Sequence, residues 1–363
     1  MKVAIVHDWL VSGGGGAERV VYELHKIYPD APIYTSYCSP DLRQQFGGDK
    51  VITSYMQYWP FSKLRKFLPP LRALWFSRLK LDEYDLVISS SGAEAKGIKV
   101  NKPTIHINYC HAPTHYYWSR YDEYIQNPGF GKMDWLARIG LKLLLGPMRK
   151  WDYKAAQRPD YIIANSGYIK KQVKKYYGRD SSVVHPPVDI DRFSQPVEEP
   201  RRGFITIGRQ TPYKRIDLAV TACSELDLPL VVLGSGPEHN KLKRMAGKSV
   251  TFFRGKNDEE VARYFQTSVG FIFPGLDDFG IVGIEALAAG TPIIAYGQGG
   301  SLDYVNSKTG ILFKEQTKES LIEAIKQFET RKFSESAIKA EANKFSPAEF
   351  KTKMSRLIKS FVV

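Results

Sequence analysis

The sequence predicts the α/β class, with two successive parallel-sheet domains, and three observations support this prediction. Short apolar runs alternate with stretches of helical periodicity, as expected for parallel strands joined by crossover helices. The alternation occurs twice, and residues 189–202, a polar stretch containing Pro and Glu, separate the two series. A chain of 363 residues is also longer than the roughly 100–200 residues that one domain usually contains.

The first series predicts one Rossmann-like domain over residues 1–188. Its first strand is expected at residues 2–7, followed by a glycine-rich loop at 12–16 and a helix at 17–27. Further strands are expected at residues 33–36, 86–89, 105–109 and 161–164, and the segment 183–188 closes this half.

The second series predicts a similar domain over residues 203–345, after a linker at 189–202. Its strands are expected at residues 204–207, 230–233, 250–253, 269–273 and 293–295. The last segment, 346–363, starts with Ser346 and Pro347, which suit a helix N-cap and first position. Its apolar residues follow at helical spacing: Phe350, Met354, Leu357 and Phe361. We expect a terminal helix that packs back on the first domain.

The formal charge of +14 is distributed unevenly. Through Pro187 there are 27 Lys and Arg against 16 Asp and Glu, and after it 25 against 22. A basic first half favours an anionic partner, such as a nucleic acid, a phospholipid surface or a phosphate-bearing substrate. Residues 55–81 and 135–151 mix basic with aromatic and aliphatic residues, which is typical of an anionic membrane interface. The alternative is ordinary helices with solvated basic outer faces.

No apolar run approaches the roughly 18–20 residues that a membrane span needs. The first strand has too few apolar residues for a signal peptide. Three widely spaced cysteines, Cys38, Cys110 and Cys223, favour neither a disulfide framework nor a zinc site. These features together favour the cytoplasm.

The glycine-rich loop invites a comparison with dinucleotide-binding proteins. Glycines between a strand and a helix bring backbone N–H groups toward a ligand at the helix N-terminus. The dinucleotide fingerprint also needs an acidic residue at the end of the second strand. That strand ends with Ser36 and is followed by Tyr37, with no carboxylate before Asp41. An NAD-dependent oxidoreductase therefore remains only an alternative.

Two cations stand where a phosphate would bind in the second domain. Arg209 follows a predicted strand, and Lys214 lies five residues on, before a helix. Such charges at the carboxyl edge of a sheet can clamp a diphosphate and stabilise it as it leaves. Gly236, after the next strand, can present backbone to the same ligand.

A pair of carboxylates adds the most specific signal. Asp277 lies in a loop, seven residues follow, and Glu285 lies inside a predicted helix that starts near residues 279–281. The N–H groups of Phe279, Gly280 and Ile281 face a diphosphate at such a helix start. Glu285 can accept ribose hydroxyls and Asp277 sugar hydroxyls. The segment thus has groups for all three parts of a nucleotide sugar.

These motifs together resemble retaining glycosyltransferases of family 4, over nearly the whole chain. The shared marks are Gly15–Glu18, Asn165-Ser166, residues 186–189, Gly208-Arg209 with Lys214-Arg215, Asp277 with Glu285, and Gly299-Gly300. The resemblance implies a GT-B fold, in which two Rossmann-like domains flank a cleft and the second binds the donor. The family's first Glu is Asp277 here, one methylene shorter, with Asp278 as a substitute. The resemblance assigns the ribose to Glu285.

The resemblance also implies roles for residues of both domains and a choice of donor. His111, after a predicted strand, is expected beside the reacting sugar, with Gly15 and Gly16 nearby. Arg254 is expected near the nucleotide base, together with Gly255 and Lys256. The sequence around Asp277 and Tyr296 is similar to that of bacterial mannosyltransferases of surface-polysaccharide assembly. We therefore expect GDP-mannose as donor, a UDP-sugar as the alternative, and a saccharide acceptor, lipid-linked and met at the inner face of the membrane.

The Asp189-Ile190-Asp191 pattern holds a divalent metal in another transferase fold. Here it lies in the predicted linker, away from either strand edge, so we expect neither an essential metal nor a cofactor. Two further hypotheses belong to other classes. The charge of +14 is compatible with a nucleic-acid-binding protein, although charge alone does not explain Asp277 and Glu285, and we expect no nucleic acid partner. A catalytically inactive sugar-binding homologue would explain the shortened Asp277.

Overall fold

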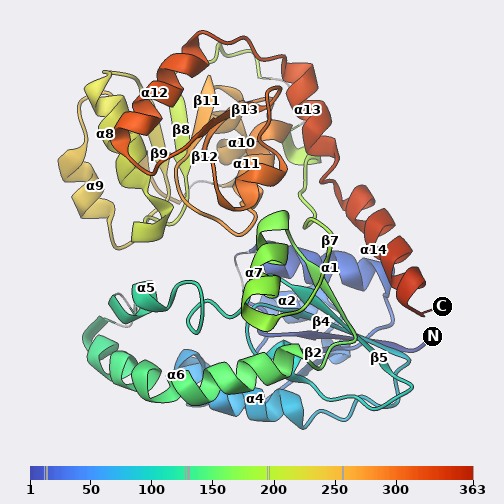
Figure 1. Ribbon diagram of the computed structural model, residues 1–363. Helices are drawn as coiled ribbons and strands as arrows, with labels where there is room; N and C mark the ends of the chain where they lie inside the picture. The colour runs from blue at the N-terminus through green and yellow to red at the C-terminus, as the bar shows by residue number, and fades with distance from the viewer. Residues whose placement is uncertain are drawn as a thin grey trace. The chain divides into compact units, whose positions relative to one another are not determined.

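The computed structural model describes residues 1–363 except 12, 14, 127, 129, 130, 194, 196, 256 and 363, and the side chains of 66 and 132 are also left undescribed. The chain divides into two compact units. Unit 1 comprises residues 1–187 and 350–363, and unit 2 comprises residues 188–349. Figure 1 shows each unit as a sheet covered by helices.

Unit 1 contains a seven-stranded parallel sheet in the order β3-β2-β1-β4-β5-β6-β7. Its strands are β1 (Val3–His7), β2 (Ile33–Thr35), β3 (Val51–Thr53), β4 (Leu86–Ser91), β5 (Ile105–Cys110), β6 (Tyr161–Ala164) and β7 (Ser182–Val183). Its α-helices are α1 (Gly16–Ile27), α2 (Pro40–Gln45), α3 (Phe61–Leu64), α4 (Pro69–Ser77), α5 (Tyr121–Gln126), α6 (Asp134–Ala156), α7 (Gly167–Tyr177) and most of α14 (Pro347–Val362). Short 3₁₀ turns are η1 (Gly48–Lys50), η2 (Tyr55–Gln57), η3 (Arg65–Phe67), η4 (Ala95–Gly97) and η5 (Gly131–Met133).

Unit 2 contains a six-stranded parallel sheet in the order β10-β9-β8-β11-β12-β13. The strands are β8 (Phe204–Ile207), β9 (Leu230–Leu233), β10 (Val250–Phe253), β11 (Gly270–Phe273), β12 (Ile293–Tyr296) and β13 (Gly310–Phe313). The helices are α8 (Ile216–Glu225), α9 (His239–Met245), α10 (Asp258–Gln266), α11 (Ile281–Ala288), α12 (Lys318–Glu329) and α13 (Glu335–Asn343), with 3₁₀ turns η6 (Asp191–Phe193), η7 (Pro212–Lys214) and η8 (Gly299–Asp303).

The predicted α/β class with two Rossmann-like parallel sheets is confirmed. Two strands were not predicted, β3 and β13, and both are edge strands of three or four residues. The segment expected at 183–188 is a strand only at Ser182–Val183. Pro186 and Pro187 have no backbone N–H to donate to a sheet, so pairing stops before them.

The terminal helix α14 packs on the core of unit 1. Phe350, Met354 and Ile358 are buried in the same cluster as the residues of β1 and α1. Leu357 and Phe361 pack at its edge, and the ring of Phe361 stacks on Tyr161 with centroids 3.9 Å apart. The one-face spacing of apolar residues therefore has a direct structural use in holding the helix to the sheet.

Residues 189–202, expected as a linker, belong to unit 2. Val188 and Phe193 are fully buried in its core, and Ile190 packs against the same cluster. The apolar residues inside this polar stretch explain the difference, because they bury their side chains against α10 and α11.

Candidate active site

The candidate site of unit 2 lies where the strand order of its sheet reverses. β8 and β11 are neighbours at this point. Ligands of open α/β sheets bind at the carboxyl ends of such strands, where the connections leave in opposite directions. Arg209 follows β8, and Asp277 follows β11. Two of the predicted site residues therefore lie at the position that the topology favours.

A pocket of about 600 Å³ opens at the carboxyl ends of β8 and β9. Arg209 and Gly236 line it, together with Gly255 and Val261. A Cβ atom on Gly236 would collide with the backbone carbonyl of Gln210. The loop after β8 and the loop after β9 thus pack backbone against backbone, which requires glycine at position 236. Both loops expose peptide groups to the pocket. The volume is in the range of small-molecule sites.

Lys214 and Asp277 form an ion pair at the switch point. The Nζ–Oδ2 distance is 2.5 Å, and the side chains are 17% and 14% exposed. Lys214 ends η7, and its backbone lies against Gly275, where a Cβ would be only 2.9 Å from it. The loop after β8 and the loop after β11 are therefore held together by both charge and close packing.

Helix α11 begins directly behind Asp277. Gly280 is its N-cap with a φ of 82°, and Ile281 is its first residue, so the predicted start is confirmed. The Tyr304 hydroxyl donates to the Gly280 carbonyl at 3.2 Å. Burial raises the pKa of Tyr304 well above its usual range, and the Asp277 carboxylate raises it further, so the hydroxyl keeps its proton. Gly300 donates its N–H to the Asp277 carbonyl at 2.9 Å, which joins η8 to this loop.

Three further predicted donor-binding residues lie in different surroundings. Phe279 is buried in the core, 5.7 Å from both Tyr304 and Phe345 by ring centroids, so only its backbone faces a ligand. Glu285 is buried and forms an ion pair with Arg192 at 2.7 Å. Arg254 is exposed after β10, and its neighbour Gly255 lines the pocket. Lys256 lies outside the described residues.

The sheet of unit 1 has its switch point between β1 and β4, and the predicted residue His111 lies beside it. His111 follows β5, and its Nε2 lies 2.7 Å from Ser90 Oγ. His7 Nδ1 lies 2.7 Å from the Ser90 carbonyl, and the two His rings are 6.1 Å apart. Serine and strand backbone thus fix the orientation of both rings at the carboxyl edge.

The Asp8 carboxylate anchors the loop beside His111. It accepts the backbone N–H groups of Gly92, Ala93 and Ala95 at 2.7–2.9 Å. Asp8 and Ser90 could not be predicted from the sequence, because a single buried acid after a strand, or a serine near a strand's end, has no periodic signature. Gly15 is the N-cap of α1 and Gly16 its first residue, while Ser12 and Gly14 of the same loop lie outside the described residues.

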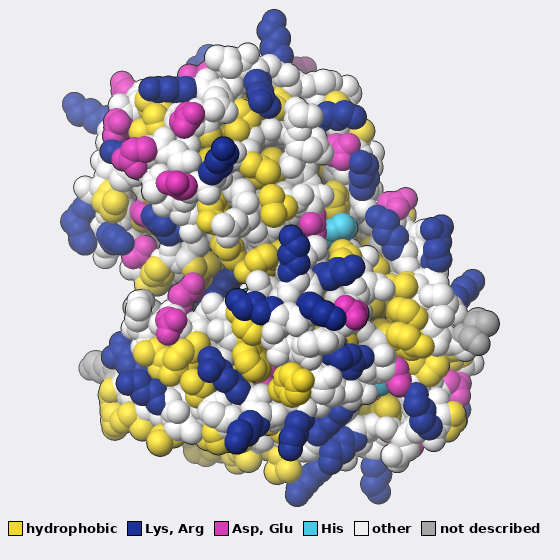
Figure 2. All heavy atoms as spheres, viewed as in Figure 1, with side chains coloured by type: hydrophobic (Ala, Val, Ile, Leu, Met, Phe, Trp, Pro, Cys, Tyr) yellow, Lys and Arg dark blue, Asp and Glu magenta, His cyan; other side chains and the backbone are white. Residues whose placement is uncertain are grey.

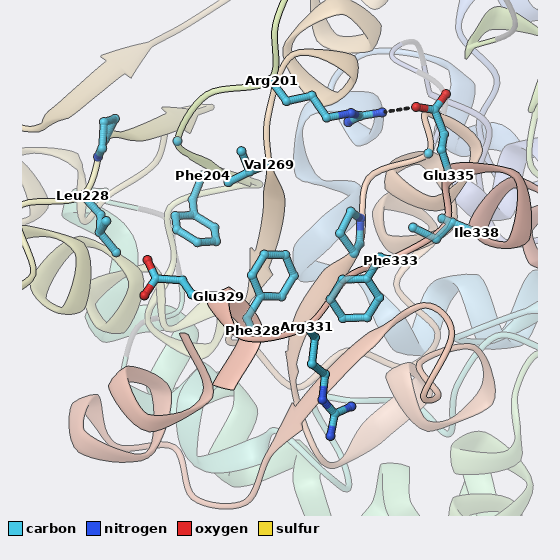
Figure 3. Close-up of a pocket in the computed structure, with 14 residues that line it drawn as sticks. Arg201, Phe204, Leu228, Val269, Phe328, Glu329, Arg331, Phe333, Glu335 and Ile338 are labelled. Atoms are coloured by element: carbon cyan, nitrogen blue, oxygen red, sulfur yellow. Dashed lines mark hydrogen bonds and ion pairs between the residues drawn. The ribbon is translucent and has the colours of Figure 1, made fainter. Parts of the chain in front are cut away.

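A second pocket in unit 2, of about 580 Å³, lies at the opposite edge of the sheet. Figure 3 shows Phe204, Phe328 and Phe333 in it, with Arg201 joined to Glu335. Arg201 also donates to the carbonyls of Phe265, Ser268 and Ala289. Its charge is used to hold the amino ends of the strands, so we assign the chemistry to the other pocket.

In the described part of the chain, His, Cys, Asp and Glu side chains form no group of three or more arranged to hold a metal ion. Asp191 belongs to η6, next to Arg192. Among the same residues, none of the helices combines the length and apolarity that crossing a bilayer requires.

Two family models match the chain. The model described as Glycosyltransferase Family 4 matches residues 14–192, and the model described as Glycosyl transferases group 1 matches residues 187–345. The two matches overlap at residues 187–192, where the boundary between the two units lies, and together they span residues 14–345.

Curated relatives have related names. The chain is 25% identical to the alpha-1,3/1,6-mannosyltransferase ALG2 of Kluyveromyces lactis, over 84% of this chain and 71% of that protein. The chain is also 25% identical to ALG2 of Schizosaccharomyces pombe, over 86% of this chain and 70% of that protein. A D-inositol 3-phosphate glycosyltransferase of Mycobacterium tuberculosis is 28% identical over 41% of this chain and 36% of that protein.

Solved structures share the fold at low identity. Anabaena Alr3699/HepE, in complex with UDP, aligns with a TM-score of 0.70 and 16% identity over 99% of this chain and 100% of that chain. The catalytic domain of starch synthase IV from Arabidopsis thaliana, bound to ADP and acarbose, aligns with a TM-score of 0.60 and 14% identity over 100% of both chains. The expected GT-B fold is thereby confirmed.

Proposed function

Because the chain belongs to glycosyltransferase family 4, we propose that it transfers mannose from GDP-mannose to a saccharide hydroxyl, with retention of anomeric configuration. Glycosyl transfer follows from the family itself. The likeness to two yeast mannosyltransferases at 25% identity supports mannose. The surface-polysaccharide acceptor is an extension of the same proposal, drawn from the resemblance of the sequence motifs.

The ion pair of Lys214 with Asp277 at the switch point is the observation that carries the proposal. When the bond between the sugar and the phosphate breaks, negative charge grows on the departing diphosphate. Arg209 in the pocket and Lys214 beside it supply positive charge, and the N–H groups at the start of α11 supply partial charge. Fixed charges stabilise such a transition state without having to reorganise.

Asp277 and Glu285 take the hydroxyl groups of the donor in this proposal. Lys214 holds the Asp277 carboxylate, so the shorter side chain has a defined direction toward the sugar. Glu285, on the second turn of α11, accepts the ribose hydroxyls. In unit 1, we assign His111, whose Nε2 lies beside Ser90 Oγ, to recognition of the saccharide.

A UDP-sugar is the second candidate donor. Among the residues that the structure describes, the pocket is lined mainly by glycine backbone and small or apolar side chains, and Arg209 is the charged one. Such a lining holds a base largely through peptide groups, so it selects weakly between guanine and uracil.

A donor screen tests the function. The purified protein is incubated with GDP-, UDP-, ADP- and dTDP-sugars, with and without simple saccharide acceptors, and released nucleoside diphosphate is measured. We expect release from GDP-mannose and none from a Glu285→Ala variant, with an α-linked product by NMR. Release from a UDP-sugar alone would mean that the donor is that UDP-sugar and not GDP-mannose. If no donor releases its nucleoside diphosphate, and no nucleoside diphosphate shifts the melting temperature of the protein, an inactive homologue would be favoured.

We further propose that no divalent metal is essential, because Arg209, Lys214 and the α11 N-terminus together meet the charge of a diphosphate. Activity in the same screen is expected to persist in excess EDTA. Loss of turnover in EDTA and recovery with Mg²⁺ or Mn²⁺ would contradict this.

Unit 1 has a surface suited to an anionic membrane and a lipid-linked acceptor at the cytoplasmic face. Trp135, Ile139 and Leu143 lie four residues apart on α6 and are 62%, 47% and 74% exposed. Tyr58 and Trp59, before α3, are 70% and 76% exposed. Figure 2 shows Lys and Arg side chains beside hydrophobic ones along the lower edge, where Figure 1 places α4 and α6. Apolar insertion and cation attraction act together at such an interface.

Vesicle flotation tests the membrane part. We expect the protein to float with vesicles rich in phosphatidylglycerol, and a Trp135→Ser/Leu143→Ser variant to bind about tenfold more weakly, because two exposed apolar side chains are lost. Met245→Ser, which removes an exposed apolar side chain of unit 2, is the matched control and should bind normally. Equal binding of the α6 variant, or no binding of the wild type at low salt, would rule out this surface.

A further inference from the structure

Arg192 joins three elements of unit 2. It lies in η6, directly after the Asp-Ile-Asp pattern to which we assign no metal. Its Nη2 lies 2.7 Å from Glu285 Oε1 on α11, and its Nη1 lies 2.8 Å from Asp258 Oδ2 in the first turn of α10. One guanidinium thus connects the segment that enters unit 2 with both helices beside the candidate site.

The Arg192 guanidinium is held in place from behind. Its Cζ lies 4.6 Å from the centroid of the Phe193 ring, which is fully buried in the core of unit 2. The Arg192 and Glu285 side chains are 16% and 11% exposed, whereas Asp258 is 81% exposed. Shielding from water strengthens the bond to Glu285 more than the bond to Asp258. The planar fork therefore sets the direction of the Glu285 carboxylate.

Fold stability is a poor reason for this arrangement. Desolvating two charges costs about as much as their attraction returns, and apolar residues often serve equally well. In addition, Arg192 Nε is buried without a hydrogen-bond partner among the described residues. The location suggests a ligand instead, because Val261 on α10 lines the 600 Å³ pocket one turn from Asp258.

We propose that Arg192 is a positioning residue of the donor site, which holds the Glu285 carboxylate directed at the ribose hydroxyls of the nucleotide. This inference rests on the proposed function, in which Glu285 accepts those hydroxyls. Arg192 itself acts through Glu285. It therefore contributes to recognition of the ribose, and affinity for the diphosphate and base does not depend on it.

Calorimetric titration with GDP and 2′,3′-dideoxy-GDP tests the proposal, with UDP and its dideoxy analogue in parallel. We expect the wild type to prefer GDP by about 100-fold, since hydrogen bonds to a charged acceptor are strong. Arg192→Met should reduce this preference about tenfold by weakening GDP, with dideoxy-GDP bound as before. Arg192→Lys should fall between, because it keeps the charge but loses the fork. Arg263→Met, on the same α10 and paired with exposed Glu199, should change neither affinity.

A double variant separates positioning from folding. Arg192→Met/Glu285→Gln leaves no uncompensated buried charge, since Asp258 is exposed, and we expect the same ribose preference as in Glu285→Gln alone, because both residues act as one unit. Additive losses in the double variant would overturn the proposal. A folded Arg192→Met protein that keeps the full preference for GDP would also overturn the proposal about Arg192. The proposed function would not be affected by that result. If the wild type binds neither GDP nor UDP, the proposed function fails, and this inference with it.

Discussion

Replacing Arg209 or Lys214 by Ala is expected to lower kcat of glycosyl transfer by about 10²–10³. In the proposed function each cation lies beside the leaving diphosphate, so its contribution should be larger in the transition state than in the ground state. KM for the donor should rise less than kcat falls. The measurement is steady-state release of nucleoside diphosphate from the donor identified in the screen.

The two variants differ in what they leave behind. Arg209 lines the pocket, so its removal takes away a charge alone. Removal of Lys214 also leaves the Asp277 carboxylate without its 2.5 Å partner. Lys214→Ala/Asp277→Asn removes that extra penalty and should still be slow. Lys318→Ala, which breaks an exposed pair with Glu225, is the matched control and should retain wild-type activity. Losses below threefold in both site variants would contradict their assignment.

Much of the fold could be predicted because it depends on local patterns. Apolar runs long enough to span a buried strand were predicted from the sequence, such as residues 230–233, which form β9 (Leu230–Leu233). The edge strands β3 and β13 were missed, although β2 and β9, which are equally short, were predicted, so strand length alone does not explain the difference. Their pairing with β2 and β12 is determined by tertiary neighbours.

The candidate site could be predicted in part for the same reason. The proximity of Arg209, Lys214 and Asp277 could be expected because residues after parallel strands meet at one edge of the sheet. The ion pair of Glu285 with Arg192 could not be found, because the partners lie far apart in the chain and on different elements. Phe279 was assigned to the donor from its neighbours, although its side chain completes the core.

The buried network around Asp152 in unit 1 combines stability with the geometry near His111. Asp152 on α6 is fully buried and lies 2.6 Å from the Lys96 ammonium, which is also buried. It accepts hydrogen bonds from Thr114 Oγ1, Trp118 Nε1 and Tyr177 Oη at 2.7–2.8 Å. Burial raises the pKa of Tyr177 well above its usual range, and the charge of Asp152 raises it further, so this hydroxyl remains a donor.

Asp152→Ala is therefore expected to destabilise unit 1 by about 3–5 kcal/mol, because it leaves the Lys96 charge buried without a carboxylate. Scanning calorimetry should show a fall in Tm of about 10 °C for a unit of this size. Asp152→Asn, which keeps hydrogen-bond acceptors but loses the charge, should cost less. Asp180→Ala breaks an exposed pair with Lys174 and should cost less than about 1 kcal/mol.

The same variant also tests the link between this network and the site. Thr114 and Trp118 belong to the segment that follows His111, so loss of Asp152 releases that segment from α6. Below its lowered Tm, Asp152→Ala should still transfer sugar more slowly than Asp180→Ala, because the backbone carrying His111 is less constrained. A Tm shift equal to that of Asp180→Ala would mean that solvent reaches Lys96 when its partner is lost. A large shift with unchanged turnover would separate the stability of unit 1 from the positioning of His111.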